Sequence, residues 1–120
     1  MEDKIEYQER MKERTKGFAL RVIGLYGTLS YQNAGGVLGK QLLRAATSVA
    51  ANYRAACRAR SGREFFAKIS IAVEEADEAL FWLELLSESG LVPVEKLAPL
   101  LQEALEILKL LATARKNTQV

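Results

Sequence analysis

Apolar side chains recur every three to four residues along most of this 120-residue chain, the spacing that places them on one face of a helix. Interruptions of this pattern divide the chain into four predicted helices. The first is expected over residues 15–30, the second over 39–60 and the third over 62–89. The fourth is expected to begin at Pro93, because proline is favourable in the first turn of a helix.

The links between these helices contain residues that end or begin helices. An asparagine and paired glycines at residues 32–36 predict a turn. Ser61 is placed to cap the third helix, with Glu64 completing a capping box. Gly90 can adopt the left-handed conformation that ends a helix. Because the link at Ser61 is tight, we expect the second and third helices to pack antiparallel as a hairpin.

Each predicted helix has an apolar stripe that we expect to face the core. The stripe of the second helix is rich in small residues, which lets a neighbouring helix approach closely. The clearest stripe belongs to the fourth helix and consists of Val94, Leu97, Ala98, Leu101, Ala104, Leu105, Leu108, Leu111 and Ala112.

Four amphipathic helices joined by short links predict an all-α, antiparallel up-down-up-down four-helix bundle over residues 15–116. Residues 1–14 are nearly all charged or polar, so they either extend the first helix or stay disordered. Residues 117–120 are predicted to be a flexible C-terminus. No apolar run approaches the length of a membrane span, and no secretion signal is visible, so we expect a cytoplasmic protein without membrane contact.

The sequence offers little catalytic chemistry. It contains no histidine, which removes the usual general base and most transition-metal sites. Cys57 is the only cysteine and is interpreted as core packing. Glutamates spaced i, i+3 resemble carboxylates of di-metal bundles, but solvated or salt-bridged acids are the favoured interpretation. These pairs are Glu75 with Glu78 and Glu103 with Glu106. We therefore predict no enzymatic activity, metal or cofactor, with a carboxylate metalloenzyme as the minor alternative.

Charge is segregated along the chain. Residues 39–63 carry six cations and no acid, whereas residues 64–106 carry ten acids against two lysines. On the second helix the cations occupy a narrow sector opposite the core stripe, and they are Lys40, Arg44, Arg54 and Arg58. Such a stripe could contact nucleic-acid phosphates without reading sequence. The alternative is that acids of the third helix neutralise it.

A second apolar surface predicts self-association. A lone bundle needs one apolar stripe on each helix, yet the third and fourth helices carry more. The additional residues predicted to form an oligomer interface are Ile71, Trp82, Leu85, Leu100, Ile107, Leu110 and Ala114. Glu75 and Glu78 flank this surface and are expected to meet arginines of a neighbouring subunit.

Two segments give the chain a family resemblance over about residues 17–116. The run SVAANYR at residues 48–54 and the run EADEALFWLELL at residues 75–86 resemble the bacterial four helix bundle family, also called the 23S rRNA intervening-sequence protein family. One departure is that Ala55 and Ala56 follow the Asn-Tyr-Arg segment, where the family commonly has an acid directly afterwards.

The resemblance implies a homopentameric ring similar to the accessory variability determinant of diversity-generating retroelements, a relative that binds nucleic acid and partners a reverse transcriptase. By this analogy the four cations of the second helix would contact phosphates, with Ser48 and Asn52 as polar positioning groups. The first hypothesis is thus a non-enzymatic, oligomeric accessory protein that binds RNA or DNA. The second is an oligomeric scaffold or protein-interaction module.

Overall fold

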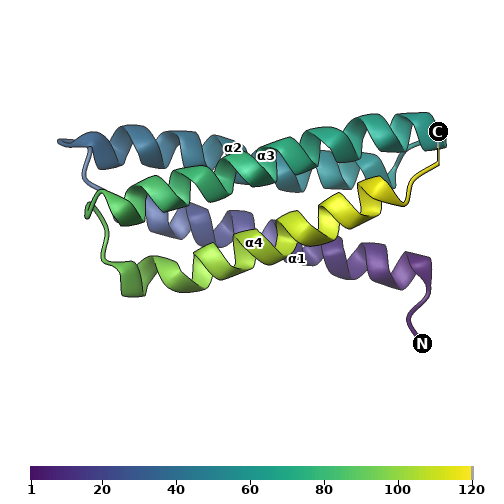
Figure 1. The fold of residues 1–120 in the computed structure, drawn as a ribbon, viewed down its shortest axis with the longest axis horizontal. Coiled ribbons are helices and arrows are strands. Elements are labelled where there is room, and N and C mark those ends of the chain that lie inside the picture. The colour runs from purple at the N-terminus through teal and green to yellow at the C-terminus, as the bar shows by residue number, and fades with distance from the viewer. Residues whose placement is uncertain (120) are drawn as a thin grey trace.

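Four antiparallel helices form the molecule, and in this computed structural model residues 1–119 are described (Figure 1). The helices are α1 (Lys4–Tyr26), α2 (Ala34–Cys57), α3 (Gly62–Glu88) and α4 (Val94–Lys116). Each helix contacts the helices before and after it in the chain, and α4 returns to α1. This cyclic order confirms the predicted up-down-up-down bundle.

The N-terminal segment extends α1. Asp3 caps the helix by accepting a hydrogen bond from the backbone N–H of Glu6 at 2.8 Å. Met11 and Thr15 are buried, and the Thr15 hydroxyl donates to the Met11 carbonyl at 3.0 Å. Residues 4–14 therefore belong to the bundle, because Met11 lies in the core and Tyr7 packs against it.

The link between α1 and α2 differs from the prediction. α1 ends at Tyr26 rather than residue 30, and α2 begins at Ala34 rather than residue 39. Asn33 is the N-cap, since its side chain accepts from the backbone N–H of Gly35 at 2.7 Å. A Cβ at Gly39 would lie 2.3 Å from Leu29 Cδ1. The glycines thus allow the preceding loop to pack closely on α2; they do not break the helix.

The α2–α3 hairpin is confirmed and forms the most extensive helix interface. Both helices bury alanines where they meet, which allows the close approach expected from the sequence. The Ser61 hydroxyl accepts from the N–H of Glu64 at 3.1 Å, so the predicted serine cap is present. Gly90 has φ of 76°, the left-handed conformation predicted at the end of α3.

The orientation of α4 corrects the sequence interpretation. Its buried residues are Leu97, Leu100, Ala104, Ile107 and Leu111, a three-and-four spacing. Leu100 and Ile107 were predicted to form an oligomer interface, but they are 6% and 1% exposed and lie in the protomer core. Val94, predicted to be in the core, is 56% exposed. Two overlapping apolar stripes satisfy the helical period, and only packing against α1 and α3 selects between them.

At the C-terminus, Asn117 caps α4 and the Thr118 hydroxyl donates to the Ala114 carbonyl at 2.7 Å. Residues 117–119 of the segment predicted to be flexible therefore adjoin the bundle, and Val120 lies outside the described residues. Within residues 1–119, none of the helices is long and apolar enough to cross a membrane.

Candidate nucleic-acid interface

The four cations predicted to bind nucleic acid are all exposed, but they do not form one uniform stripe. Arg44 faces α3, whereas Arg54 and Arg58 line a groove between α2 and α1. Lys40 is exposed nearer the start of α2. The neighbouring helices therefore divide the predicted stripe into parts with different surroundings.

Arg44 is neutralised within the protomer. Its guanidinium donates to Glu75 Oε2 at 2.7 Å and also to the carboxylate of Glu78. Trp82 Nε1 donates to Glu78 at 3.1 Å, which completes a small network on the α2–α3 surface. Hydrogen bonding to Arg44 lowers the pKa of Glu78, and the pKa of Arg44 is raised by the two glutamates. For this residue the structure has the intramolecular pairing that was the alternative to phosphate binding.

The groove that Arg54 and Arg58 line is more basic than acidic. It has a volume of about 440 Å³, and α1 contributes four charged residues to it, which are Glu9, Lys12, Glu13 and Lys16. Lys12 forms an ion pair with Glu9 at 2.6 Å. Four cations thus stand against two carboxylates, one of which is already paired. A polyanion meets an excess of positive charge at this groove.

Small residues form the floor of the groove. Ala50 and Ala51 line the groove together with the two arginines, so α2 contributes only small side chains besides its cations. In the described part of the chain, Lys16, Arg54 and Arg58 form no ion pair within 4 Å. Their guanidinium and ammonium groups are therefore available to phosphate oxygens.

Asn52 and Ser48, the predicted polar positioning groups, are bonded to each other. Asn52 Nδ2 donates to the Ser48 carbonyl and to Ser48 Oγ, each at 3.0 Å. Both residues are half-buried on α2. The amide protons of Asn52 are thus directed along its own helix and not toward the groove.

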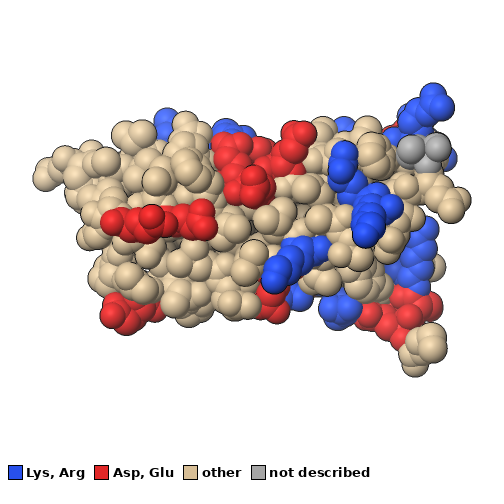
Figure 2. Space-filling model, in the orientation of Figure 1, with Lys and Arg blue, Asp and Glu red and all other residues tan. Residues whose placement is uncertain are grey.

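Charge is segregated in space as well as along the chain. On the face seen in Figure 2, most Lys and Arg side chains gather over the half of the bundle where both chain termini lie, together with one group of carboxylates at the N-terminal corner, whereas carboxylates dominate the other half. The last turns of α2 belong to the basic end because α2 runs back toward the start of α1. Arg54 and Arg58, which lie at the C-terminal end of α2, are therefore at the same end of the bundle.

Only part of the predicted oligomer surface is exposed to solvent. Ile71 is 40% exposed, and Trp82, Leu85, Leu110 and Ala114 are half-buried. Leu100 and Ile107 are not available, as described above. The structure adds Phe81, which is 49% exposed and lies edge-to-face against Trp82 with ring centroids 5.2 Å apart. On α1 it adds Leu20 and Ile23, which are 58% and 48% exposed.

Both glutamate pairs that resembled di-metal ligands hold an arginine. On α4, Arg14 donates to Glu103 at 2.7 and 2.9 Å and lies 3.5 Å from Glu106. On α3, Arg44 donates to both Glu75 and Glu78. Across residues 1–119, no three His, Cys, Asp or Glu side chains gather as metal ligands would. The salt-bridged interpretation of these acids is therefore confirmed.

Sequence reasoning missed the contribution of α1 to the groove. Lys12 and Lys16 are four residues apart and so lie on one helix face, which is a visible signal. Its meaning depended on whether residues 1–14 are helical and on which side of α2 they pack. The sequence left the first question open and could not address the second.

Comparison with known proteins is consistent with this fold. A model of the 23S rRNA-intervening sequence protein family matches residues 8–113. A solved structure from Bacteroides thetaiotaomicron, described as a protein with unknown function from the S23 ribosomal protein family, is 35% identical with a TM-score of 0.84. The match covers 92% of this chain and 98% of that one. No curated protein matches the chain.

Proposed function

The chain belongs to the 23S rRNA-intervening sequence protein family, and the solved structure described above is of unknown function, so we propose a function from the geometry of the site. The protein is a non-enzymatic, oligomeric accessory protein that binds the phosphate backbone of RNA or DNA. The contact surface is the α1–α2 groove, with Arg54 and Arg58 on one wall and Lys16 on the other, beside the paired Lys12 and Glu9.

One observation carries this proposal: two unpaired, exposed arginines one helical turn apart face a second helix that adds lysines across a small-residue floor. Backbone phosphates bind to such cations without base readout, and the released counterions make affinity fall with salt. Arg44 is left out of the surface, since its charge is already satisfied by Glu75 and Glu78.

Self-association forms part of the proposal. A homopentameric ring, as the family resemblance implies, would cover exposed apolar side chains such as Phe81 and Ile71, which a protomer leaves in water. A ring would also repeat the basic groove around its circumference, so several weak phosphate contacts would act together. Light scattering tests this assembly against the protomer mass of 13.3 kDa.

The decisive experiment compares binding of a structured RNA and a DNA duplex by the wild type and an Arg54→Glu, Arg58→Glu variant across a salt titration. A Lys109→Glu, Lys116→Glu variant makes the same charge change on exposed residues of α4, outside the groove. We expect the groove variant to lose binding and the α4 variant to keep it. Replacing the two arginines by alanine should lower the slope of log affinity against log salt by about one for each lost phosphate contact.

The second candidate function is a protein scaffold, and the Arg44 network favours it, because it shows acids of α3 neutralising a cation of α2. Under this alternative the wild type binds neither nucleic acid at low salt, while light scattering still finds an oligomer. Equal loss of binding in both charge-reversal variants would indicate a general effect of net charge and would also count against the groove.

A further inference from the structure

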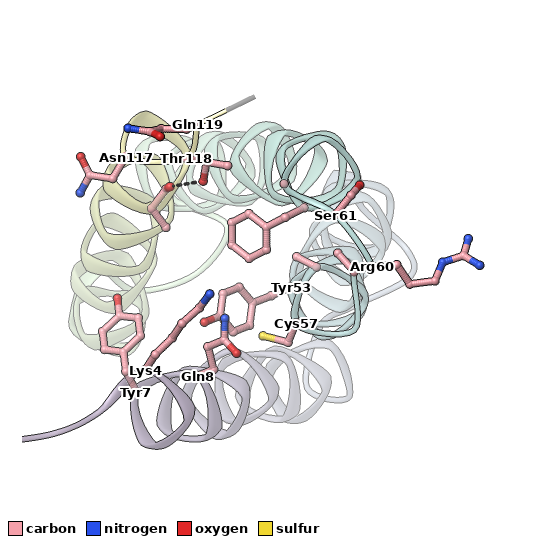
Figure 3. Close-up of a pocket in the computed structure, with 15 residues that line it drawn as sticks. Lys4, Tyr7, Gln8, Tyr53, Cys57, Arg60, Ser61, Asn117, Thr118 and Gln119 are labelled. Atoms are coloured by element: carbon pink, nitrogen blue, oxygen red, sulfur yellow. Dashed lines mark hydrogen bonds between the residues drawn. The ribbon is translucent and has the colours of Figure 1, made fainter.

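A second cavity, separate from the basic groove, lies at the end of the bundle that holds both chain termini (Figure 3). All four helices border it, and its volume is about 620 Å³, within the range of small-molecule sites. Nothing in the proposed phosphate-binding surface uses this cavity. Its lining combines an aromatic wall with polar groups at the rim.

The aromatic wall consists of Tyr7 from α1, Tyr53 from α2 and Phe65 from α3. Tyr53 is only 2% exposed, and burial together with the neighbouring Cys57 side chain raises the pKa of its hydroxyl, so the phenol stays protonated. Figure 3 shows this hydroxyl pointing into the cavity. A protonated phenol in this position can donate a hydrogen bond to a ligand inside the cavity.

The charged side chains that line the cavity are positive. Among residues 1–119, Lys4 and Arg60 line it and no Asp or Glu does. In Figure 3 the side chain of Lys4 extends into the cavity, whereas that of Arg60 points away from it. Two helices begin at this end and two end there, so their dipoles oppose each other and the side-chain charges decide the electrostatic preference. That preference is for an anion at Lys4.

We propose that this cavity binds a small aromatic anion, that is, a planar apolar ring carrying one carboxylate, sulfonate or phosphate group. The ring packs among Tyr7, Tyr53 and Phe65, and the anionic group pairs with the Lys4 ammonium. The Tyr53 hydroxyl donates a hydrogen bond to a polar substituent of the ligand. This proposal is independent of nucleic-acid binding, because the basic groove shares no residue with the cavity.

Cys57 provides a reporter inside the cavity. It lines the wall beside Tyr53, is half-buried and is the only cysteine of the chain, so alkylation reads out a single site. Burial raises the pKa of the Cys57 thiol, and the reaction is therefore run at about pH 9. The probe ligand is 8-anilinonaphthalene-1-sulfonate, whose fluorescence measures binding while iodoacetamide measures the accessibility of Cys57.

In the wild type, we expect the probe to slow alkylation of Cys57 at least fivefold at saturation. Lys4→Glu should abolish this protection, and α1 should still form because an acid is favourable in the first turn of a helix. Lys16→Glu makes the same charge change on α1 outside the cavity and should leave protection unchanged. Tyr53→Phe, which removes only the hydroxyl, should weaken probe binding several-fold. Circular dichroism checks that each variant is folded.

Three outcomes would overturn the proposal. Probe fluorescence without protection of Cys57 would place the probe on an exposed apolar surface such as that of Phe81. Equal effects of Lys4→Glu and Lys16→Glu would show attraction by net charge alone. A wild-type Cys57 that does not react even without probe would show that the cavity is closed in solution.

Discussion

The ion pair between Arg14 and Glu103 connects α1 to α4, the two neighbouring helices that contact each other least. Two hydrogen bonds of 2.7 and 2.9 Å join the guanidinium to the carboxylate, and the side chains are 27% and 18% exposed. Exposed ion pairs contribute about 0.2–1 kcal/mol, whereas hydrogen bonds to charged groups contribute about 1.5–3 kcal/mol. With partial burial between these limits, Glu103→Gln should lower the free energy of unfolding by about 1–2 kcal/mol.

The assay is urea unfolding followed by circular dichroism at a fixed protomer concentration, because assembly would otherwise change the apparent stability. A loss of this size corresponds to a decrease of roughly 0.5–1 M in the urea midpoint. Glu106→Gln is the matched control on the same helix. Glu106 lies 3.5 Å from the same arginine and its side chain is 48% exposed, so its loss should cost less than about 0.5 kcal/mol.

The dependence on pH follows from the pKa of Glu103, which hydrogen bonding to Arg14 lowers from its ordinary value of 4.5. The carboxylate therefore stabilises the folded state above that ordinary value, and the contribution is lost as pH falls through the lowered pKa. The difference between wild type and Glu103→Gln should be full at pH 7 and disappear in acid. Equal costs for the two glutamine variants, or a difference that persists in acid, would refute this account of the pair.

Three further changes test the packing of the bundle by the same unfolding assay. Ile107→Ala should lower the free energy of unfolding by about 2–5 kcal/mol, because the Ile107 side chain is 1% exposed. Ile23 is 48% exposed, so Ile23→Ala should lower it by less than about 1 kcal/mol. Similar losses in the two variants would contradict the core position of Ile107. Gly90→Ala should destabilise the protein by about 1–2 kcal/mol because φ at Gly90 is 76°. Gly17→Ala should stabilise it by about 0.5–1 kcal/mol because nothing lies within 4 Å of the added methyl group. If Gly17→Ala were the more destabilising of the two, the described backbone would be wrong. Ser61→Ala should cost about 1 kcal/mol through loss of the α3 cap, and an unchanged midpoint would argue against that hydrogen bond.

The sequence by itself determined the features that depend on local physics. The helical period, the serine cap and the left-handed glycine after α3 each involve a few neighbouring residues, so the fold class and the α2–α3 hairpin could be predicted. The absence of histidine likewise restricts the chemistry without any structure. The family resemblance, read from two short segments, agrees with the family that matches residues 8–113.

Only the tertiary structure decided between local arrangements that fit the sequence equally well. Residues 1–14 are compatible with helix or disorder, and contact of Met11 with the core selects the helix. The apolar residues of α4 fit two stripes, and packing between α1 and α3 buries the one that contains Leu100 and Ile107. Arg44 and Arg54 occupy the same predicted face, yet α3 neutralises one and α1 leaves the other free. Each of these outcomes depends on contacts with side chains distant in sequence, so it cannot be predicted from the apolar period of a single helix.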